Sequence, residues 1–201
     1  MRISGGTAKG RKVGMRKAFV GKGENDELRP TASKVREAIF NILSGRIIES
    51  RFLDLYAGTG AVGIEALSRE ASQVVMVEDN AARVAIIKDL LEKFGFAGRA
   101  TVVKNSVAAF LRKPSQAAFD IIFLDPPYAS DELRHVLPVI DKSNLVAADG
   151  IVIVEHSSKH ILSNRFANLT LKKTYRYGDT ALTLYRSTLC EIQAYEERTV
   201  S

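Results

Sequence analysis

The chain has 201 residues, of which 46% are hydrophobic, so it can bury a sizeable core, and we expect one main domain with an extension. Its single cysteine, Cys190, excludes an internal disulfide and favours a reduced intracellular compartment. The basic N-terminus lacks the apolar stretch of a signal peptide, and no run approaches the roughly 18–20 apolar residues of a membrane span. We therefore expect a cytoplasmic protein that does not bind a membrane.

The net charge of +6 is concentrated at the start of the chain. Residues 1–51 contain 12 Lys or Arg and 5 Asp or Glu, whereas residues 52–201 contain 17 and 18. A basic segment on a near-neutral body indicates docking to a polyanion through counterion release, and a merely solvated face is the alternative. The concentration into one segment favours nucleic acid.

The first predicted elements are a basic arm and a helix. Residues 1–30 are rich in Gly, Lys and Arg, and we interpret them as an irregular arm that could hold one β-hairpin, with a flexible loop at 21–27. Pro30 should end the arm, and Thr31 or Ser33 can cap the helix that follows. We expect Lys34 and Arg36 to face outward from this helix. Its apolar stripe consists of Val35, Ala38, Ile39, Ile42 and Leu43.

Strands and helices alternate from residue 51 onward. Runs rich in apolar and β-branched residues predict buried strands at residues 51–56, 73–78, 100–104, 119–125 and 150–156. Helical patterns lie between them, at roughly 61–69, 80–94, 106–112 and 130–143. Residues 169–186 alternate around Gly178 and Asp179, which predicts a β-hairpin.

This order of elements predicts an α/β protein with a doubly wound, mostly parallel seven-stranded sheet, the Rossmann-like layout of S-adenosylmethionine-dependent methyltransferases. In such a sheet the ligand binds outside the carboxyl ends of the strands. We expect residues 1–30 to form the basic arm, 31–186 the main domain and 187–201 a C-terminal tail without assigned function.

A glycine-rich loop follows the first strand of this sheet. Residues 58–63 read G-x-G-x-x-G, in which Gly58 and Gly60 permit close approach to a ligand and Gly63 permits tight packing of the next helix. Glu78 ends the second strand, where an acidic side chain accepts hydrogen bonds from ribose hydroxyls. The loop and Glu78 indicate a nucleoside cofactor, and they fit NAD and S-adenosylmethionine equally.

Asp54 favours S-adenosylmethionine. It lies four residues before Gly58, where a dinucleotide site usually has apolar strand residues. A carboxylate there suits a ligand that carries an ammonium and a sulfonium and no pyrophosphate. The alternative is that Asp54 only accepts hydrogen bonds from loop amides.

The fourth predicted strand runs directly into Asp125-Pro126-Pro127-Tyr128. Two successive prolines fix φ twice and remove two backbone donors, which leaves a carboxylate, bare carbonyls and an aromatic ring. Asp125 and the Pro126 carbonyl can accept the two hydrogens of an exocyclic amino group, and Tyr128 can stack on the base that carries it. A lone Pro-Pro is usually a loop rigidifier. Together with the glycine loop, however, this tetrapeptide predicts methylation of an amino group, with S-adenosylmethionine as the cofactor.

The chain resembles the RsmD family, bacterial 16S ribosomal RNA guanine-(N2)-methyltransferases, over about residues 1–186. The similarity lies in G-x-x-K-G-R at 6–11, RPT-x-x-x-VRE-x-x-FNIL at 29–43, D-x-x-AGTG-x-x-G-x-EALSR at 54–69, DPPY at 125–128 and YG-x-T at 177–180. The AGTG and DPPY motifs alone would also fit DNA adenine methyltransferases.

The resemblance implies roles for individual residues. The catalytic set is Asp125, Pro126, Pro127 and Tyr128. The cofactor set is Asp54, Ala57, Gly58, Thr59, Gly60, Glu78, Asp79, Asn105 and Ser106. Asn105 and Ser106 stand where related enzymes have an acidic residue against the adenine, so the group that contacts the adenine stays open. The RNA-binding set is Arg2, Lys9, Arg11, Lys12, Arg16, Lys17, Arg29 and Thr31, some of which could be merely solvated.

The resemblance also implies a partner, 16S rRNA within a 30S subunit or an assembly intermediate. A monomer is the default expectation, because the sequence carries no signal for the oligomeric state. We expect no metal, and His135, His156 and His160 fit no catalytic pattern. An adenine-N6 methyltransferase would share the chemistry but usually needs a larger recognition segment. An NAD-dependent oxidoreductase would leave Asp54 and the DPPY tetrapeptide unexplained, and a non-catalytic RNA-binding protein would be expected to have lost one of the motifs.

Overall fold

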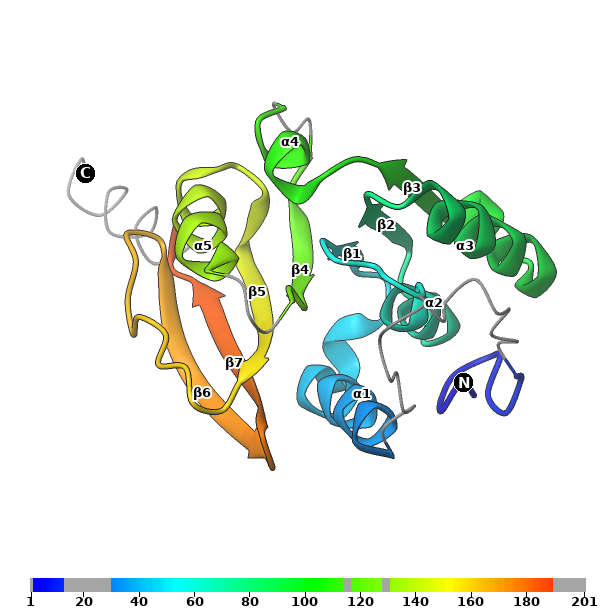
Figure 1. Cartoon of the computed structure of the whole chain (residues 1–201), viewed down its shortest axis with the longest axis horizontal. Coiled ribbons are helices and arrows are strands. Elements are labelled where there is room, and N and C mark those ends of the chain that lie inside the picture. Colours follow the sequence, from blue (N-terminus) through cyan, green and yellow to red (C-terminus); the bar gives the residue numbers. More distant parts are fainter. Residues whose placement is uncertain (1, 13–29, 114–116, 128–130, 190–201) are drawn as a thin grey trace, which may run out of the picture. The chain divides into compact units, whose positions relative to one another are not determined.

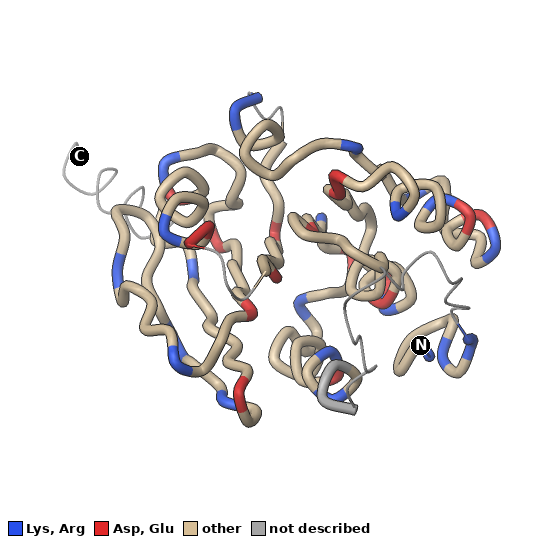
Figure 2. Tube along the Cα trace, in the orientation of Figure 1, with Lys and Arg blue, Asp and Glu red and all other residues tan. Residues whose placement is uncertain are grey.

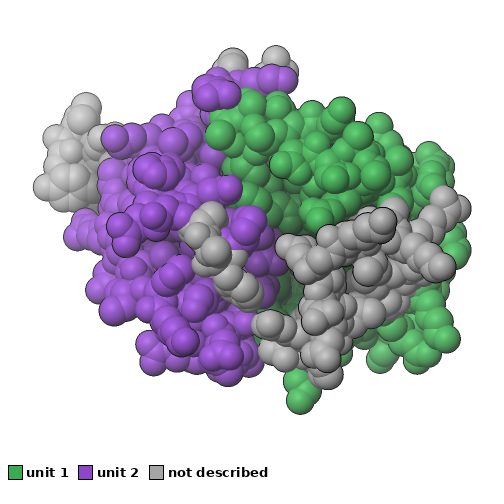
Figure 3. All heavy atoms as spheres, viewed as in Figure 1, with its two compact units in different colours: residues 1–110 green, residues 111–201 purple. Residues whose placement is uncertain are grey.

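The computed structural model describes residues 2–12, 30–113, 117–127 and 131–189, with the side chains of residues 30–32 excepted. The chain divides into two compact units, Met1–Phe110 and Leu111–Ser201 (Figure 3). Each unit combines parallel strands with helices, as the elements labelled in Figure 1 show.

Unit 1 contains three parallel strands in the order β3-β2-β1. These are β1 (Arg51–Asp54), β2 (Gln73–Glu78) and β3 (Ala100–Lys104). Because β1 and β2 are almost wholly buried, they read in the sequence as continuous apolar runs rather than alternating ones.

The helices of unit 1 are α1 (Pro30–Leu43), α2 (Ala61–Ser68) and α3 (Ala81–Phe94), and the short α4 (Val107–Leu111) leads into unit 2. The predicted caps Thr31 and Ser33 lie inside the first helix of unit 1, which begins at Pro30. Short 3₁₀ segments occupy Ser44–Ile47 and Ala97–Arg99. The Asn80 side chain accepts hydrogen bonds from the first amides of α3, and Gly95 ends this helix in the left-handed conformation at φ 74°.

Helix α1 buries its predicted apolar stripe, with Val35, Ile39 and Leu43 at most 2% exposed. Lys34 is exposed as expected. The prediction that Arg36 faces outward is wrong, because its residue is only 6% exposed and its guanidinium contacts other parts of unit 1. Helical periodicity places Arg36 outside the apolar stripe of α1. Its contacts with the Arg2 carbonyl and with Glu65 of α2 nevertheless bury it.

Unit 2 holds four strands in the order β4-β5-β7-β6 and the helix α5 (Glu132–Lys142). The strands are β4 (Phe119–Leu124), β5 (Val146–Ser157), β6 (Leu169–Tyr177) and β7 (Thr180–Ser187). Strand β5 is parallel to β4, whereas β7 is antiparallel to β5 and β6. The predicted hairpin is confirmed, and Gly178 supplies the positive φ of 63° that its turn requires.

The strand order of the seven strands is β3-β2-β1-β4-β5-β7-β6. The predicted α/β class is therefore confirmed, together with the seven-stranded, mostly parallel sheet and its antiparallel hairpin. Among the described residues, no helix is both long and apolar enough to cross a membrane.

Candidate active site

Asp54 ends β1 as a buried carboxylate with an unused acceptor. Its residue is 1% exposed, and Oδ1 has no hydrogen-bond partner among the residues that the structure describes. Burial raises the pKa of Asp54 to about 7; amides of Gly63 and Tyr56 oppose this rise, and the negative charge of Glu78 adds to it. A buried acceptor without a donor is costly, so the site fits a ligand that brings a positive charge or an N–H group to Asp54.

The glycine-rich loop has the backbone geometry that its sequence predicts. Gly58 and Gly60 have φ values of 52° and 73°, which favour glycine. A Cβ on Gly63 would lie 2.6 Å from the Met76 Sδ of β2, so the predicted role of Gly63 in helix–sheet packing is confirmed. The loop therefore exposes backbone rather than side chains at the ends of β1 and β2.

Glu78 fixes this loop from the end of β2. Its Oε2 accepts a hydrogen bond from the Gly58 amide at 2.8 Å, and Oε1 accepts one from the Asn80 amide at 2.9 Å. Burial raises the pKa of Glu78, and the nearby Asp79 side chain also raises it, whereas the Arg83 guanidinium 3.8 Å away lowers it. The predicted ribose contact of Glu78 stays a prediction. Its bond to Gly58 has no signal in the sequence, because it joins residues twenty positions apart.

Asn105 and Ser106 follow β3 at the same edge of unit 1. The Asn105 amide donates to the Glu78 carbonyl at 3.1 Å, which extends the pairing of β2 and β3 by one residue. Ser106 caps α4, since its Oγ accepts a hydrogen bond from the Ala109 amide at 3.3 Å. Of the rest of the cofactor set, Ala57 is buried and donates its amide to Val77, and Thr59 is half-buried.

The candidate catalytic residues lie in unit 2, directly after β4. Leu124, the last residue of β4, pairs with Val154 of β5 and is fully buried. Asp125 and Pro127 are exposed, whereas Pro126 between them is buried. Tyr128 lies outside the described residues.

His156 is a structural residue of unit 2. It is 3% exposed, its Nε2 lies 2.8 Å from the Thr183 hydroxyl, and its Nδ1 lies 2.9 Å from the Ser157 carbonyl. Burial lowers the pKa of His156. Both ring nitrogens are thus engaged, Nε2 with Thr183 of β7 and Nδ1 with the next residue of β5 itself.

Residues 2–12 form a closed loop at the start of unit 1. Arg2 and Lys12 form an isolated antiparallel bridge, and the Ile3 amide donates to the Arg11 carbonyl at 3.1 Å. Ile3 is 2% exposed, so this loop contributes to the core. The predicted basic arm is therefore not confirmed as a separate element, because its first residues pack on the body of unit 1.

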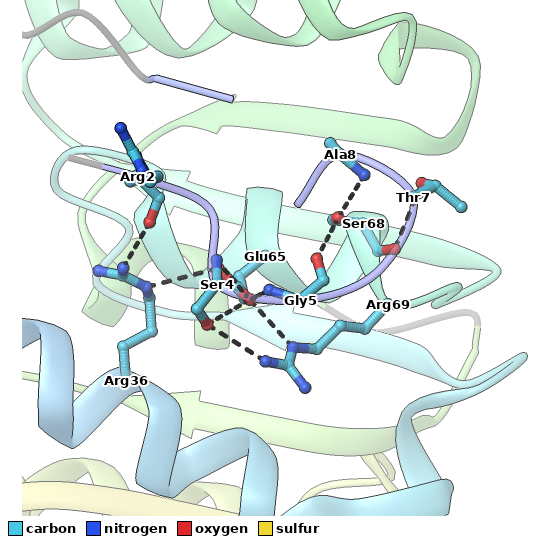
Figure 4. Close-up of polar contacts among 9 residues, drawn as sticks. All are labelled: Arg2, Ser4, Gly5, Thr7, Ala8, Arg36, Glu65, Ser68 and Arg69. Atoms are coloured by element: carbon cyan, nitrogen blue, oxygen red, sulfur yellow. Dashed lines mark hydrogen bonds and ion pairs between the residues drawn. The ribbon is translucent and has the colours of Figure 1, made fainter. Parts of the chain in front are cut away.

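Glu65 of α2 anchors this loop (Figure 4). This fully buried carboxylate accepts hydrogen bonds from the Ser4 amide at 2.9 Å, the Ser4 hydroxyl at 2.7 Å and the Gly5 amide at 2.8 Å. Arg69 donates to it from Nε at 3.0 Å, and Arg36 Nε lies 3.6 Å away. The need to neutralise Glu65 explains why Arg36 is buried.

Ser68, one helical turn further along α2, binds the next part of the loop (Figure 4). Its hydroxyl donates to the Gly5 carbonyl at 2.6 Å and accepts from the Ala8 amide at 2.9 Å, and its carbonyl accepts from the Thr7 amide at 2.7 Å. Gly6 has a φ of 73°, and a Cβ there would lie 1.7 Å from the Ser68 carbonyl oxygen. Only glycine permits this approach, so the Gly-Gly pair is a docking feature.

The structure describes half of the candidate RNA-binding residues. Lys9 and Lys12 are exposed on the docked loop, and so is Arg2, whose carbonyl accepts a hydrogen bond from Arg36. The Arg11 guanidinium lies 4.5 Å from the centre of the Phe94 ring and donates to the Lys93 carbonyl at 2.9 Å, so it is engaged within unit 1. Arg16, Lys17, Arg29 and the side chain of Thr31 lie outside the residues that the structure describes.

The candidate cofactor residues fit S-adenosylmethionine. Asp54 offers an unused buried acceptor to its cationic methionine end, and the glycine loop leaves room for close approach. In the parts of the chain that the structure describes, no group of three or more His, Cys, Asp or Glu could hold a metal ion.

Comparisons with known proteins place the chain among methyltransferases. The chain is 33% identical over 187 residues to Ribosomal RNA small subunit methyltransferase D of Escherichia coli strain K12, which covers 92% of this chain and 89% of that protein. The solved structure of Escherichia coli yhhF, provisionally named a methyltransferase, has a TM-score of 0.79 and 30% identity, covering 93% of this chain and 97% of that chain. SMU.776, also provisionally named a methyltransferase and solved with SAH, shares the fold with a TM-score of 0.54 and 14% identity, covering 76% of this chain and 48% of that one.

A family model described as Conserved hypothetical protein 95 matches residues 1–186. This range includes every motif on which the resemblance to RsmD rests, and it ends just before the predicted C-terminal tail. The chain therefore belongs to this family, the RsmD family of methyltransferases.

Proposed function

We propose that the chain transfers a methyl group from S-adenosylmethionine to the exocyclic 2-amino group of a guanine in small-subunit 16S ribosomal RNA. The observation that carries the proposal is the Asp125-Pro126-Pro127 sequence at the end of β4, where an exposed carboxylate is followed by two residues that have no backbone N–H donor. The relative named for methylation of small-subunit ribosomal RNA supports the class of substrate.

S-adenosylmethionine supplies an electrophilic methyl group when it is bound, and the residues of the chain orient its acceptor. The lone pair of a guanine 2-amino nitrogen is delocalised into the ring, which makes the nitrogen a poor nucleophile. Asp125 and the Pro126 carbonyl accept hydrogen bonds from the two amino hydrogens, which favours a pyramidal nitrogen with a free lone pair. These acceptors also stabilise the positive charge that develops on nitrogen. As the N–C bond forms, the S–C bond of the donor would break with its electron pair left on sulfur, and the surplus amino proton then passes to water.

The residues of unit 1 have a separate task, which is to hold the donor. We propose that Asp54 binds the methionine end and that Glu78 binds the ribose, while the Gly58–Gly60 backbone lies along the cofactor. Asn105 and Ser106 lie at the next strand end, so either could contact the adenine. Among the candidate RNA-binding residues that the structure describes, Lys9, Lys12 and Arg2 are exposed cations that can contact phosphates.

Transfer of labelled methyl groups to three substrates tests this proposal. These are naked 16S rRNA, 30S particles from a strain that lacks the enzyme, and duplex DNA, each digested afterwards to identify the labelled base. We expect N2-methylguanine from RNA, with 30S particles or an assembly intermediate as the better substrate and the enzyme acting as a monomer. Labelled N6-methyladenine from DNA would overturn the proposed substrate.

Asp125→Asn tests the proposed mechanism with Asp120→Asn as its matched control. Both residues are exposed aspartates, Asp120 near the start of β4 and Asp125 just after its end, so the two changes alter the charge equally at opposite ends of one strand. We expect Asp125→Asn to lower the rate of transfer by about 10²–10³-fold, a range typical of losing one electrostatic contact to the reacting group, without changing cofactor affinity. A wild-type rate in Asp125→Asn would exclude the mechanism.

A further inference from the structure

A second cluster of positive charge lies in unit 2, much further along the chain than the basic N-terminal residues 1–51. Residues 156–178 contain five Lys or Arg and no Asp or Glu, although residues 52–201 as a whole hold 17 and 18. Every one of the five side chains belongs to an exposed residue. We name this set the basic edge, and it consists of Lys159, Arg165, Lys172, Lys173 and Arg176.

The basic edge follows the outermost strand of unit 2. Three of its residues belong to β6, which ends the strand order β4-β5-β7-β6 and pairs only with β7 among the described strands. Figure 2 shows Lys and Arg recurring along the trace of this hairpin and of the segment that leads into it. The strand also carries two half-buried rings, Tyr175 and Tyr177, and the Lys173 ammonium lies 4.8 Å from the centre of the Tyr175 ring.

The hairpin tip lies at the same end of unit 2 as Asp125. Asp125 follows Leu124, which pairs with Val154 near the carboxyl end of β5, and Ser157 at that end pairs with Thr180 at the tip. Three strand spacings separate β4 from β6, which corresponds to about 14 Å. Because hydrogen-bonded ladders connect all four strands, the three β6 residues of the basic edge are held at a fixed distance from the end of β4 that Asp125 follows.

We propose that the basic edge binds the phosphate backbone of the RNA strand that flanks the target guanine. This inference rests on the proposed function and adds to it a substrate-binding surface in the same unit as the catalytic carboxylate. Five exposed cations without an intervening acidic residue match a polyanion, and the rings of Tyr175 and Tyr177 offer faces on which unpaired bases can stack. Lysines on an edge strand can also serve only to prevent edge-to-edge association, and the experiment separates these two roles.

The test is a triple variant, Lys172→Gln/Lys173→Gln/Arg176→Gln, compared with Lys113→Gln/Arg134→Gln/Lys142→Gln. Both variants remove three exposed positive charges from unit 2, but the second leaves the basic edge intact. The KM for methyl-acceptor RNA is measured between 50 and 200 mM KCl at constant magnesium, together with cofactor affinity and melting temperature.

We expect the edge variant to reduce the slope of log KM against log salt by about 2, since each phosphate contact to a single strand contributes about 0.7. At 100 mM salt this corresponds to a KM increase of about ten- to a hundredfold, with unchanged cofactor affinity. The control variant keeps a slope close to that of the wild type.

Equal slopes and KM values for the two variants would overturn the basic edge as an RNA-binding surface. Self-association of the edge variant with a wild-type KM would likewise overturn it and assign the lysines to protection of the strand. Failure of the wild-type enzyme to methylate any RNA would instead refute the proposed function, so the two failures are distinguishable.

Discussion

Binding of S-adenosylmethionine should weaken as the pH falls below 7, because its cationic methionine end requires an ionised Asp54. Burial raises the pKa of this carboxyl to about 7, and its Oδ1 has no partner among the described residues. The negative charge of Glu78 raises the pKa of Asp54 further. The ligand must therefore bind the minor, ionised form of the site in acidic solution.

The size of the effect follows from the ionised fraction of Asp54. With a pKa of about 7, this fraction rises from about 3% at pH 5.5 to about one half at pH 7, so affinity should increase about fifteenfold over this interval. Binding at pH 5.5 should also release about one proton per ligand. This pH interval lies below the pKa of the ligand's own amino group, since an α-amino group in peptides has a pKa of about 7.7–8.0.

The raised pKa of Asp54 should also make the free protein less stable at higher pH. The folded-state pKa of about 7 lies above the ordinary 3.8, so the native state binds more protons than the unfolded state between these values. The contribution to the free energy of unfolding is therefore fully present below about pH 4 and is lost as the pH rises through 7, by up to about 4 kcal/mol. Asp54→Asn should stabilise the free protein at pH 8 by a part of this amount.

Isothermal titration calorimetry in two buffers of different ionisation enthalpy measures both the affinity and the released proton. Asp141→Asn is the control, because Asp141 is another buried carboxylate but binds the backbone of residues 167–168 in unit 2. It should keep the wild-type pH dependence. A wild-type affinity that does not change between pH 5.5 and 7 would refute the assignment of Asp54.

Two further predictions concern the docked N-terminal loop. Gly6→Ala places a methyl group against the Ser68 carbonyl and should lower the free energy of unfolding by about 1–3 kcal/mol in chemical denaturation, whereas Gly45→Ala, with nothing within 4 Å of its Cβ, should be close to neutral. Glu65→Gln leaves Arg36 and Arg69 without their buried counter-ion and should cost about 3–5 kcal/mol. Because the loop carries Lys9 and Lys12, Glu65→Gln should also raise the KM for RNA at unchanged cofactor affinity. A KM equal to that of the wild type would show that the loop does not take part in RNA binding.

Most of the fold could be predicted, because its signals are local. The strands β2 and β3 begin and end at the expected residues, and helices α2 and α3 differ from expectation by a single residue at one end. The positive φ values of Gly58 and Gly60 follow from the identity of these residues in a strand–helix turn. The candidate cofactor residues could be selected from the sequence because the carboxyl ends of adjacent parallel strands meet at one edge of a sheet, and their contacts with a cofactor stay a prediction.

The sequence by itself determined the succession of strands and helices, the glycine-rich loop and the placement of Asp125 directly after a buried strand. These features arise from hydrophobic period and backbone restriction within a few neighbouring residues. Only the tertiary structure decided that Arg36 is buried, that residues 2–12 are docked and that Glu65 is the group that docks them. The physical reason is that the hydrogen bonds from Ser4 and Gly5 to Glu65 join residues 60 and 61 positions apart, a pairing that no local pattern encodes.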